Sequence, residues 1–139
     1  MTSPDSDRSV TVTQPSKADG MTAVHEALDR LWTGRDDTVR ANRDRLAFDL
    51  AVVEIAGNII RHSGSDNFDL ELTLTPAEAR ATFGDNGDPL PIDLNALRCD
   101  VDPMADHGRG LHLAQASCHQ LDYAREDGRN RWTIVRRLS

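Results

Sequence analysis

The segment from about residue 43 to residue 61 most constrains the fold of this chain, because its apolar residues recur at helical spacing and form a broad stripe. The stripe includes Leu46, Leu50, Val53 and Ile60. It is too wide for a lightly covered surface helix, so we expect this helix to be packed against a β-sheet. The polar residues that start at His62 end the helix.

One helix is predicted before this segment and two strands after it. Apolar spacing predicts a helix over residues 21–32, with Gly34 as its stop. Alternation of apolar and polar residues predicts a half-buried strand over residues 68–74. A turn then leads to a second strand over about residues 80–84, and the two strands should form an antiparallel hairpin.

The second half of the chain contains a long connection, a helix and a further hairpin. Residues 85–108 hold several prolines and scattered charges, and connections of this length are usually lids or disordered. A helix is expected over about residues 111–119, followed by strands over residues 121–125 and 132–138. Grouped helices and hairpin-joined strands indicate an α+β fold, a two-layer sandwich with a mixed or antiparallel sheet and helices on one face.

The length suits one domain, because 139 residues can bury a hydrophobic core without disulfides or metals. Residues 1–20 are rich in Ser, Thr, Asp and Pro, and we expect them to form a flexible N-terminal tail before a domain over residues 21–139. The alternation over residues 9–13 leaves an edge strand open as the alternative.

The charge balance excludes some classes of partner. Acidic residues outnumber basic ones 23 to 16, for a net charge of −7, and both nucleic acids and anionic membranes require a basic face. No apolar run is long enough to span a membrane, and the N-terminal residues lack the apolar core of a secretory signal. Cys99 and Cys118 have no CxxC partner, so we expect reduced thiols in a cytoplasmic protein.

Lys17 is the only lysine, and it lies in the polar N-terminal stretch. A Walker A loop needs a lysine directly after its glycines, and Schiff-base chemistry needs a buried lysine. A nucleotide bound by this chain is therefore held without a P-loop.

Glu54 and Asn58 form the first of three polar patches that can carry chemistry. They lie one turn apart on the long helix, share a face, and are surrounded by apolar residues, which indicates a cleft. An amide oxygen suits Mg²⁺, and a carboxylate one turn away can accept a proton from an incoming hydroxyl. The alternative is that both simply face solvent on the polar side of the helix.

The second patch is Gly84-Asp85-Asn86-Gly87-Asp88-Pro89, directly after a predicted strand. The Asp85 carboxylate could accept a hydrogen bond from an exocyclic amine such as N6 of adenine, and Gly87 would let a base approach the backbone closely. The alternative is an ordinary turn, because Asn-Gly and Asp-Pro are turn signals.

The third patch is Gly108-Arg109-Gly110-Leu111, which leads into a predicted helix. Glycines before a helix leave backbone N–H groups free to bind phosphate oxygens, and the helix dipole favours the negative charge. Arg109 could add charge-assisted hydrogen bonds. The alternative is a flexible joint at the start of a helix.

The order of the three patches resembles the GHKL superfamily of ATP-binding domains, which have the Bergerat fold. An ExxxN helix with the trailing Arg61 and His62 is followed by a strand ending in DxGxP, a long connection, and GxGL at a helix. The set is most similar to the anti-sigma-factor serine/threonine kinases, which are stand-alone regulators of bacterial sigma factors. The resemblance runs from about residue 21 to the end of the chain.

The resemblance implies a role for each patch. Asn58 would hold the Mg²⁺ that bridges the phosphates of ATP, and Glu54 would be the general base. Asp85 would bind the adenine amine, and Gly87 would shape the adenine pocket. The other implied positions are Gly108, Arg109, Gly110 and Leu111 at the phosphates, a lid over about residues 90–107, and Thr133 near adenine.

The implied activity is transfer of the γ-phosphoryl group of Mg·ATP to a serine or threonine of a small STAS-type antagonist protein. The resemblance also implies a homodimer that binds a sigma factor or a similar regulator. Two alternatives stay open. One is an ATP-binding module that sequesters its partner with little or no kinase activity. The other is the catalytic domain of a histidine kinase, against which the chain has no room for a helical hairpin with a phospho-accepting histidine.

Two groups of charges accompany these patches. The expected lid contains an acidic run at Asp93, Asp100, Asp102 and Asp106. This run would oppose phosphate binding unless Mg²⁺, Arg98 or Arg109 offset it. The C-terminal hairpin carries arginines at positions 125, 129, 131, 136 and 137. They predict a solvated basic face that balances the lid, or alternatively a docking face for an acidic partner.

Overall fold

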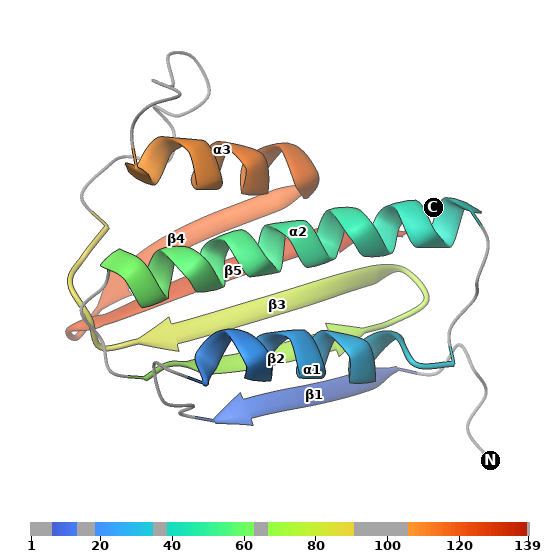
Figure 1. Cartoon of the computed structure of the whole chain (residues 1–139), viewed down its shortest axis with the longest axis horizontal. Coiled ribbons are helices and arrows are strands. Elements are labelled where there is room, and N and C mark those ends of the chain that lie inside the picture. The colour runs from blue at the N-terminus through green and yellow to red at the C-terminus, as the bar shows by residue number, and fades with distance from the viewer. Residues whose placement is uncertain (1–6, 14–18, 35–38, 63–66, 91–105, 139) are drawn as a thin grey trace.

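The computed structural model in Figure 1 describes residues 7–13, 19–34, 39–62, 67–90 and 106–138. These residues form three helices and one five-stranded sheet. The strands are β1 (Arg8–Thr13), β2 (Asp69–Leu74), β3 (Glu78–Asp85), β4 (Gln120–Glu126) and β5 (Arg129–Arg137). The helices are α1 (Gly20–Trp32), α2 (Val39–His62) and α3 (Asp106–Ser117).

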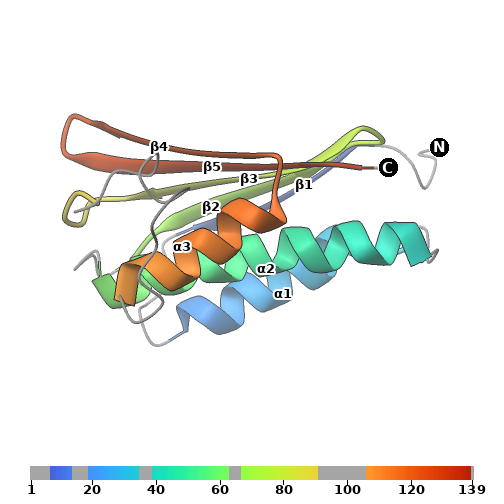
Figure 2. The same ribbon diagram turned by 90° about the horizontal axis from the view of Figure 1, so that it is seen from above.

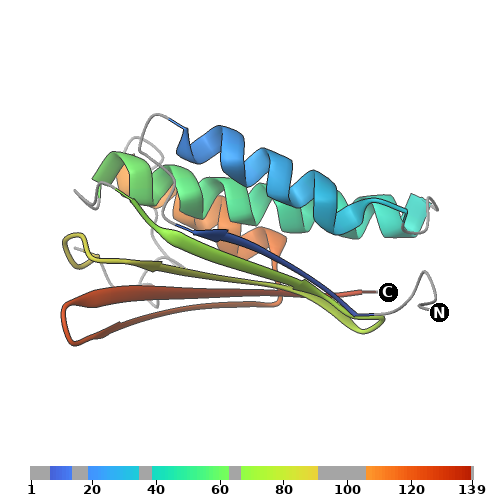
Figure 3. The same ribbon diagram turned by 90° about the horizontal axis from the view of Figure 1, so that it is seen from below.

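The sheet has the strand order β1-β2-β3-β5-β4, and each pair of neighbours is antiparallel. The helices lie together on one face of it, which Figure 2 shows from the side. α1 packs on β1 and β2, α2 on β3 and β5, and α3 on β4 (Figure 3). The predicted α+β two-layer sandwich is therefore confirmed, with an antiparallel sheet. None of the described helices is both long and apolar enough to cross a membrane.

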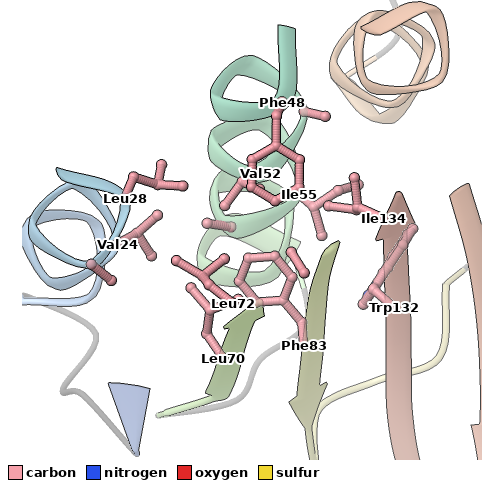
Figure 4. Packing of buried hydrophobic residues seen from close by; sticks show 14 of the residues in the cluster. Val24, Leu28, Phe48, Val52, Ile55, Leu70, Leu72, Phe83, Trp132 and Ile134 are labelled. Atoms are coloured by element: carbon pink, nitrogen blue, oxygen red, sulfur yellow. The ribbon is translucent and has the colours of Figure 1, made fainter. Parts of the chain in front are cut away.

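The core lies between the two layers, because alternate strand residues point to the same face of a sheet. Figure 4 shows side chains from α1, α2, β2, β3 and β5 meeting there. The buried residues include Val24, Leu28, Phe48, Val52, Ile55, Leu70, Leu72, Phe83, Trp132 and Ile134. α2 thus packs against the sheet as predicted, but it does so through residues such as Phe48, Val52 and Ile55. Leu46 and Leu50 of the expected stripe are wrong, because both side chains are exposed to solvent.

Strand β1 corrects the expectation of a flexible tail over residues 1–20. Residues 8–13 pair with β2 along their whole length, and Val12 reaches the core. The Arg8 guanidinium donates to the carbonyl oxygens of Arg30 and Leu31 at the end of α1, each at 3.1 Å. A short alternating segment is enough for an edge strand here, because the ladder with β2 satisfies its backbone groups.

β4 and β5 form the predicted C-terminal hairpin around a tight turn. The turn residues Asp127 and Gly128 have positive φ angles of 53° and 77°. Positive φ at both central positions defines a type I′ turn, whose twist matches that of the paired strands. The turn signal in the sequence was therefore sufficient to place this hairpin.

The five hairpin arginines do not form the single basic face that we expected. Arg136 of β5 reaches under α2, where its Nε and Nη2 donate to the buried Asp44 carboxylate at 3.1 and 3.0 Å. Arg125 points to the same side of the sheet, whereas Arg129 and Arg131 alternate onto the opposite face. Successive side chains along a strand point to opposite faces of the sheet, so the hairpin arginines are divided between the two faces.

Candidate functional site

Glu54 and Asn58 lie on the side of α2 that turns toward α3. Asn58 is only 8% exposed, and Glu54 is half-buried. Burial excludes the simple alternative in which both residues face solvent. A buried amide and a half-buried carboxylate one turn apart form a polar strip within an otherwise apolar part of the helix layer.

The Glu54 carboxylate meets Gly110 of α3. A Cβ atom built on Gly110 would lie 2.8 Å from Glu54 Oε2 and 3.8 Å from Glu54 Cδ. A methyl group in that position would displace the carboxylate, so the close approach depends on glycine. The contact brings the first and third patches of the sequence together.

The third patch lies inside α3 and not in a loop before it, which corrects the expected start at residue 111. α3 begins at Asp106, so Gly108 and Gly110 occupy its first turns. Glycine in a helix costs about 1 kcal/mol relative to alanine, and here the packing of α3 on α2 offsets that cost. The first four N–H groups of a helix lack internal partners, so the free donors belong to residues 106–109. The N–H of Gly110 is not among them.

Asp85 ends β3 on the helix-facing side and is 2% exposed. Its Oδ1 accepts hydrogen bonds from the Gly87 backbone N–H at 2.8 Å and from Asn130 Nδ2 at 3.0 Å. Its Oδ2 is buried and has no hydrogen-bond partner among the described residues. An unpaired buried carboxylate oxygen is costly, so a ligand donor at this position would be stabilised. The residues present therefore fit a base with an exocyclic amine.

Asn130 of β5 is a site residue that the sequence analysis did not identify. It is 2% exposed, and its amide nitrogen donates to Asp85 Oδ1 and to the backbone carbonyl of Asp88 at 2.8 Å. Its amide oxygen accepts from the Tyr123 hydroxyl and from Arg125 Nη1, the latter at 3.0 Å. The sequence did hold a signal for it: Asn130 is a polar residue at a position of β5 that shares a face of the strand with the buried residues Trp132 and Ile134.

Tyr123 and Arg125, from the edge strand β4, complete this network. The Tyr123 hydroxyl accepts a hydrogen bond from the Leu90 backbone N–H at 2.8 Å. Arg125 donates to the backbone carbonyl of Gly87 at 2.6 Å. The network therefore holds residues 86–90 against the end of the sheet and fixes the backbone around Gly87.

Thr133 lies outside this site. Trp132 and Ile134, its neighbours along β5, point to α2 in Figure 4, so Thr133 points to the face of the sheet that the described helices leave uncovered. Its pairing partner, Thr82, lies on that same face. We therefore withdraw Thr133 as an adenine contact, since Asp85 and Asn130 lie on the helix-facing side.

The other predicted residues are placed as follows. Leu111 is 1% exposed and belongs to the hydrophobic core. For residues 106–109, which include Gly108 and Arg109, the structure describes the backbone and not the side chains. The expected lid beyond Leu90, with Arg98 and most of the acidic run, lies outside the described residues.

A hollow of about 760 Å³ lies on the uncovered face of the sheet, away from Glu54 and Asn58. Arg129 crosses it and donates to Asp69 Oδ2 at 3.2 Å and to Asn86 Oδ1 at 2.9 Å. Because the ion pair between Arg129 and Asp69 spans the hollow, we do not assign the nucleotide to it.

Comparison with known proteins identifies the fold. No protein-family model matches the sequence, and no curated protein matches it either. Among solved structures, the crystal structure of the RsbU and RsbW domains of Rv1364c from Mycobacterium tuberculosis matches with a TM-score of 0.66 and 15% sequence identity. The match covers 94% of this chain and 32% of that chain. The chain thus has the Bergerat-type fold, and the resemblance to GHKL domains is confirmed as a likeness in fold.

Proposed function

We propose that this protein is a serine/threonine kinase of the anti-sigma type, which binds Mg·ATP between α2, α3 and the end of β3. The contact between Glu54 and Gly110 carries this proposal. It sets a carboxylate beside the first turns of α3, whose free N–H groups and dipole suit phosphate oxygens. A proton acceptor next to a phosphate-binding helix end is the arrangement that phosphoryl transfer to a hydroxyl requires.

Asp85 supports adenine as the base. Its buried Oδ2 has no donor among the described residues, and the N6 amine of adenine would supply one. Guanine carries a carbonyl oxygen at the corresponding position, which would leave two acceptors facing each other. A site built to accept a hydrogen bond rejects such an analogue strongly.

Asn58 and Glu54 divide the remaining chemistry. The Asn58 amide oxygen is buried one turn from Glu54 and would be a ligand of the metal ion, because Mg²⁺ prefers oxygen ligands. Glu54 would accept the proton of the incoming hydroxyl. When bound, Mg·ATP supplies the transferable phosphoryl group and neutralises its developing charge.

The partners in this proposal follow from the resemblance seen in the sequence. The phosphoryl acceptor would be a serine or threonine of a small STAS-type antagonist protein, and the kinase would be a homodimer that also binds a sigma factor. The shared fold with the RsbU and RsbW domain structure supports this class of protein over an unrelated nucleotide-binding domain.

The first test is calorimetric titration of ATP, with and without Mg²⁺, into the wild type, Asn58→Ala and Asp85→Asn. We expect Mg²⁺-dependent binding that Asn58→Ala abolishes and Asp85→Asn weakens, with GTP as the negative control. Arg131→Ala, on the uncovered face, should bind as the wild type does. Failure of the wild type to bind ATP would refute the proposal.

The second test separates a kinase from a sequestering module. Glu54→Gln should keep its ATP affinity but transfer phosphate to a purified STAS-type antagonist protein about 10²-fold or more slowly than the wild type. Equal transfer rates would exclude Glu54 as the general base. Tight partner binding without a phosphoprotein product would favour the sequestering module.

A further inference from the structure

An exposed apolar surface runs along the solvent side of α2 and onto α3. Leu46 is 71% exposed, Leu113 40% and Leu50 39%, and these are the large apolar side chains that the described part of the chain leaves open to solvent. Single exposed leucines are ordinary, whereas a group of them on one surface marks a contact site for another molecule.

Helix spacing and the packing of α3 on α2 place the three leucines on neighbouring turns. Leu46 and Leu50 are one turn apart and share a face of α2. α3 runs antiparallel to α2 in Figure 1, and Gly110 contacts Glu54. Leu113 follows Gly110 by three residues and Leu50 precedes Glu54 by four, so they fall at the same level of the two helices. We call this surface, made of Leu46, Leu50 and Leu113, the leucine stripe.

Arginines lie on either side of the leucine stripe along α2: Arg43 is three residues before Leu46, and Arg61 is about 16 Å beyond Leu50 along the helix axis. Arg43 and Arg61 are exposed and lie on the same face of α2 as Leu50, at spacings of seven and eleven residues. Within the described residues neither forms an ion pair, whereas Arg45, Arg80, Arg129 and Arg136 do. The guanidinium of Arg61 extends back along α2 to within 2.9 Å of the position of a Cβ on Gly57.

The charges on this surface are opposite in sign to those of the chain as a whole. The protein has a net charge of −7, but α3 carries no charged residue from Gly110 to Ser117. The acidic groups beside it on α2 are Asp49 and Glu54; Asp49 is half-buried and pairs with Arg45 at 3.6 Å, which leaves Glu54 at the edge of the stripe. An apolar surface with cationic ends complements an apolar segment with anionic ends.

We propose that the leucine stripe is the docking surface for a partner protein, which presents a segment with apolar side chains between acidic ones. The apolar side chains would cover the three leucines, and the carboxylates would reach Arg43 and Arg61. A partner bound there would lie beside the Glu54 carboxylate. The position follows from the structure, and only its catalytic meaning rests on the proposed kinase function.

The test uses the full chain without nucleotide and synthetic helical peptides as probes. One peptide has leucines at i, i+4 spacing with glutamates at both ends. A second has serines in place of the leucines, and a third has lysines in place of the glutamates. Fluorescence anisotropy should show binding of the first peptide and at least about tenfold weaker binding of the other two.

Matched variants locate the binding surface. The pair Leu46→Ser with Leu50→Ser and the pair Arg43→Glu with Arg61→Glu should each weaken binding about tenfold. Arg131→Glu, the same charge reversal on the uncovered face of the sheet, should leave it unchanged. Urea midpoints equal to that of the wild type will show that the variants are folded, since every substituted side chain is exposed or half-buried at the surface.

Three outcomes would overturn the inference. One is equal binding, or no binding, of the three peptides. Another is unchanged binding by both variant pairs. The third is a wild-type dimer in sedimentation that the leucine substitutions convert to a monomer, because a second copy would then cover the stripe. ATP titration of the same variants keeps the two proposals apart, since unchanged peptide binding by both variant pairs with intact ATP binding refutes the docking surface alone.

Discussion

Glu54 Oε2 of α2 lies 2.8 Å from the point where a side chain on Gly110 of α3 would begin. The carboxylate therefore fills the space that the glycine leaves. This contact makes the position of the candidate general base depend on a residue far away in the sequence. A single methyl group at Gly110 should therefore move the Glu54 carboxylate without destabilising the fold.

Gly110→Ala should slow phosphoryl transfer about 10²-fold, because the new methyl group displaces the Glu54 carboxylate from its place beside α3. The free energy of unfolding should stay level or rise by up to about 1 kcal/mol, since alanine favours the helix. Transfer assays and urea unfolding measure the two effects. A variant that is both destabilised and fully active would contradict the prediction.

Gly57→Ala is the matched control for that substitution. A Cβ on Gly57 would lie 2.9 Å from Arg61 Nη1, a similar clash with the flexible end of a side chain. Arg61 is exposed and can move, so the transfer rate should stay within about threefold of the wild type. Equal losses in the two variants would mean that Gly110 acts through helix packing and not through Glu54.

Asn130→Ala should lower the free energy of unfolding by about 2 kcal/mol, because it removes the donor to Asp85 Oδ1 and leaves that buried carboxylate with one partner fewer. ATP affinity should fall with it, since Asp85 and the backbone at Asp88 lose their support. Thr133→Val, on the opposite face, should leave ATP affinity unchanged. Urea unfolding measures the stability of the two variants, and calorimetry measures their ATP affinity. Weaker ATP binding by Thr133→Val with unchanged binding by Asn130→Ala would restore Thr133 to the site.

Arg136→Met should lower the free energy of unfolding by about 3–5 kcal/mol, because it leaves the buried Asp44 carboxylate without its guanidinium partner. Replacing both residues, as in Asp44→Leu with Arg136→Met, should recover much of the loss. The exposed pair Arg80–Glu78 is the control, and Arg80→Met should cost less than about 1 kcal/mol. If the two arginine substitutions cost the same in urea unfolding, burial does not govern this ion pair.

Cys118 should react slowly with thiol reagents. Burial raises the pKa of its thiol to about 11 from an ordinary value of 9.0. The raised pKa lowers the thiolate fraction at pH 8 about a hundredfold relative to the unfolded chain, and labelling should accelerate as the pH rises toward 11. Iodoacetamide labelling in a Cys99→Ser background tests this. A fast reaction at pH 8 that denaturant does not accelerate would contradict it.

Much of the architecture could be predicted from local patterns. The apolar pattern of α2 correctly predicted a sheet beneath it, although Leu46 and Leu50 of that pattern are exposed. The alternation along β2 and β3 predicted one face of that sheet. The Asp-Gly pair at residues 127–128 set the last hairpin, because few residues adopt positive φ at low cost. These features depend on side-chain periodicity and backbone sterics within short segments.

Other features depended on contacts between distant segments. Residues 8–13 form a strand because β2 offers an edge with which to pair. α3 begins at Asp106 and continues through two glycines because α2 packs against it. The sequence of a short segment does not show which distant segment will pack against it. The expected tail was therefore wrong at residues 8–13, where the alternative of an edge strand holds, and the helix start at residue 111 was wrong.

The candidate site likewise depends partly on local sequence and partly on contacts between distant segments. The types and spacing of Glu54, Asn58 and Asp85 were sufficient to propose nucleotide chemistry, because those groups suit a proton acceptor, a metal ligand and an amine acceptor. Which residue of β5 supports Asp85 was decided by the register of β5 against β3, which sets Asn130 opposite Asp85 and turns Thr133 away. A period of two shows which residues share a face of a strand, but only the paired sheet and its covering helices decide which of the two faces holds the site.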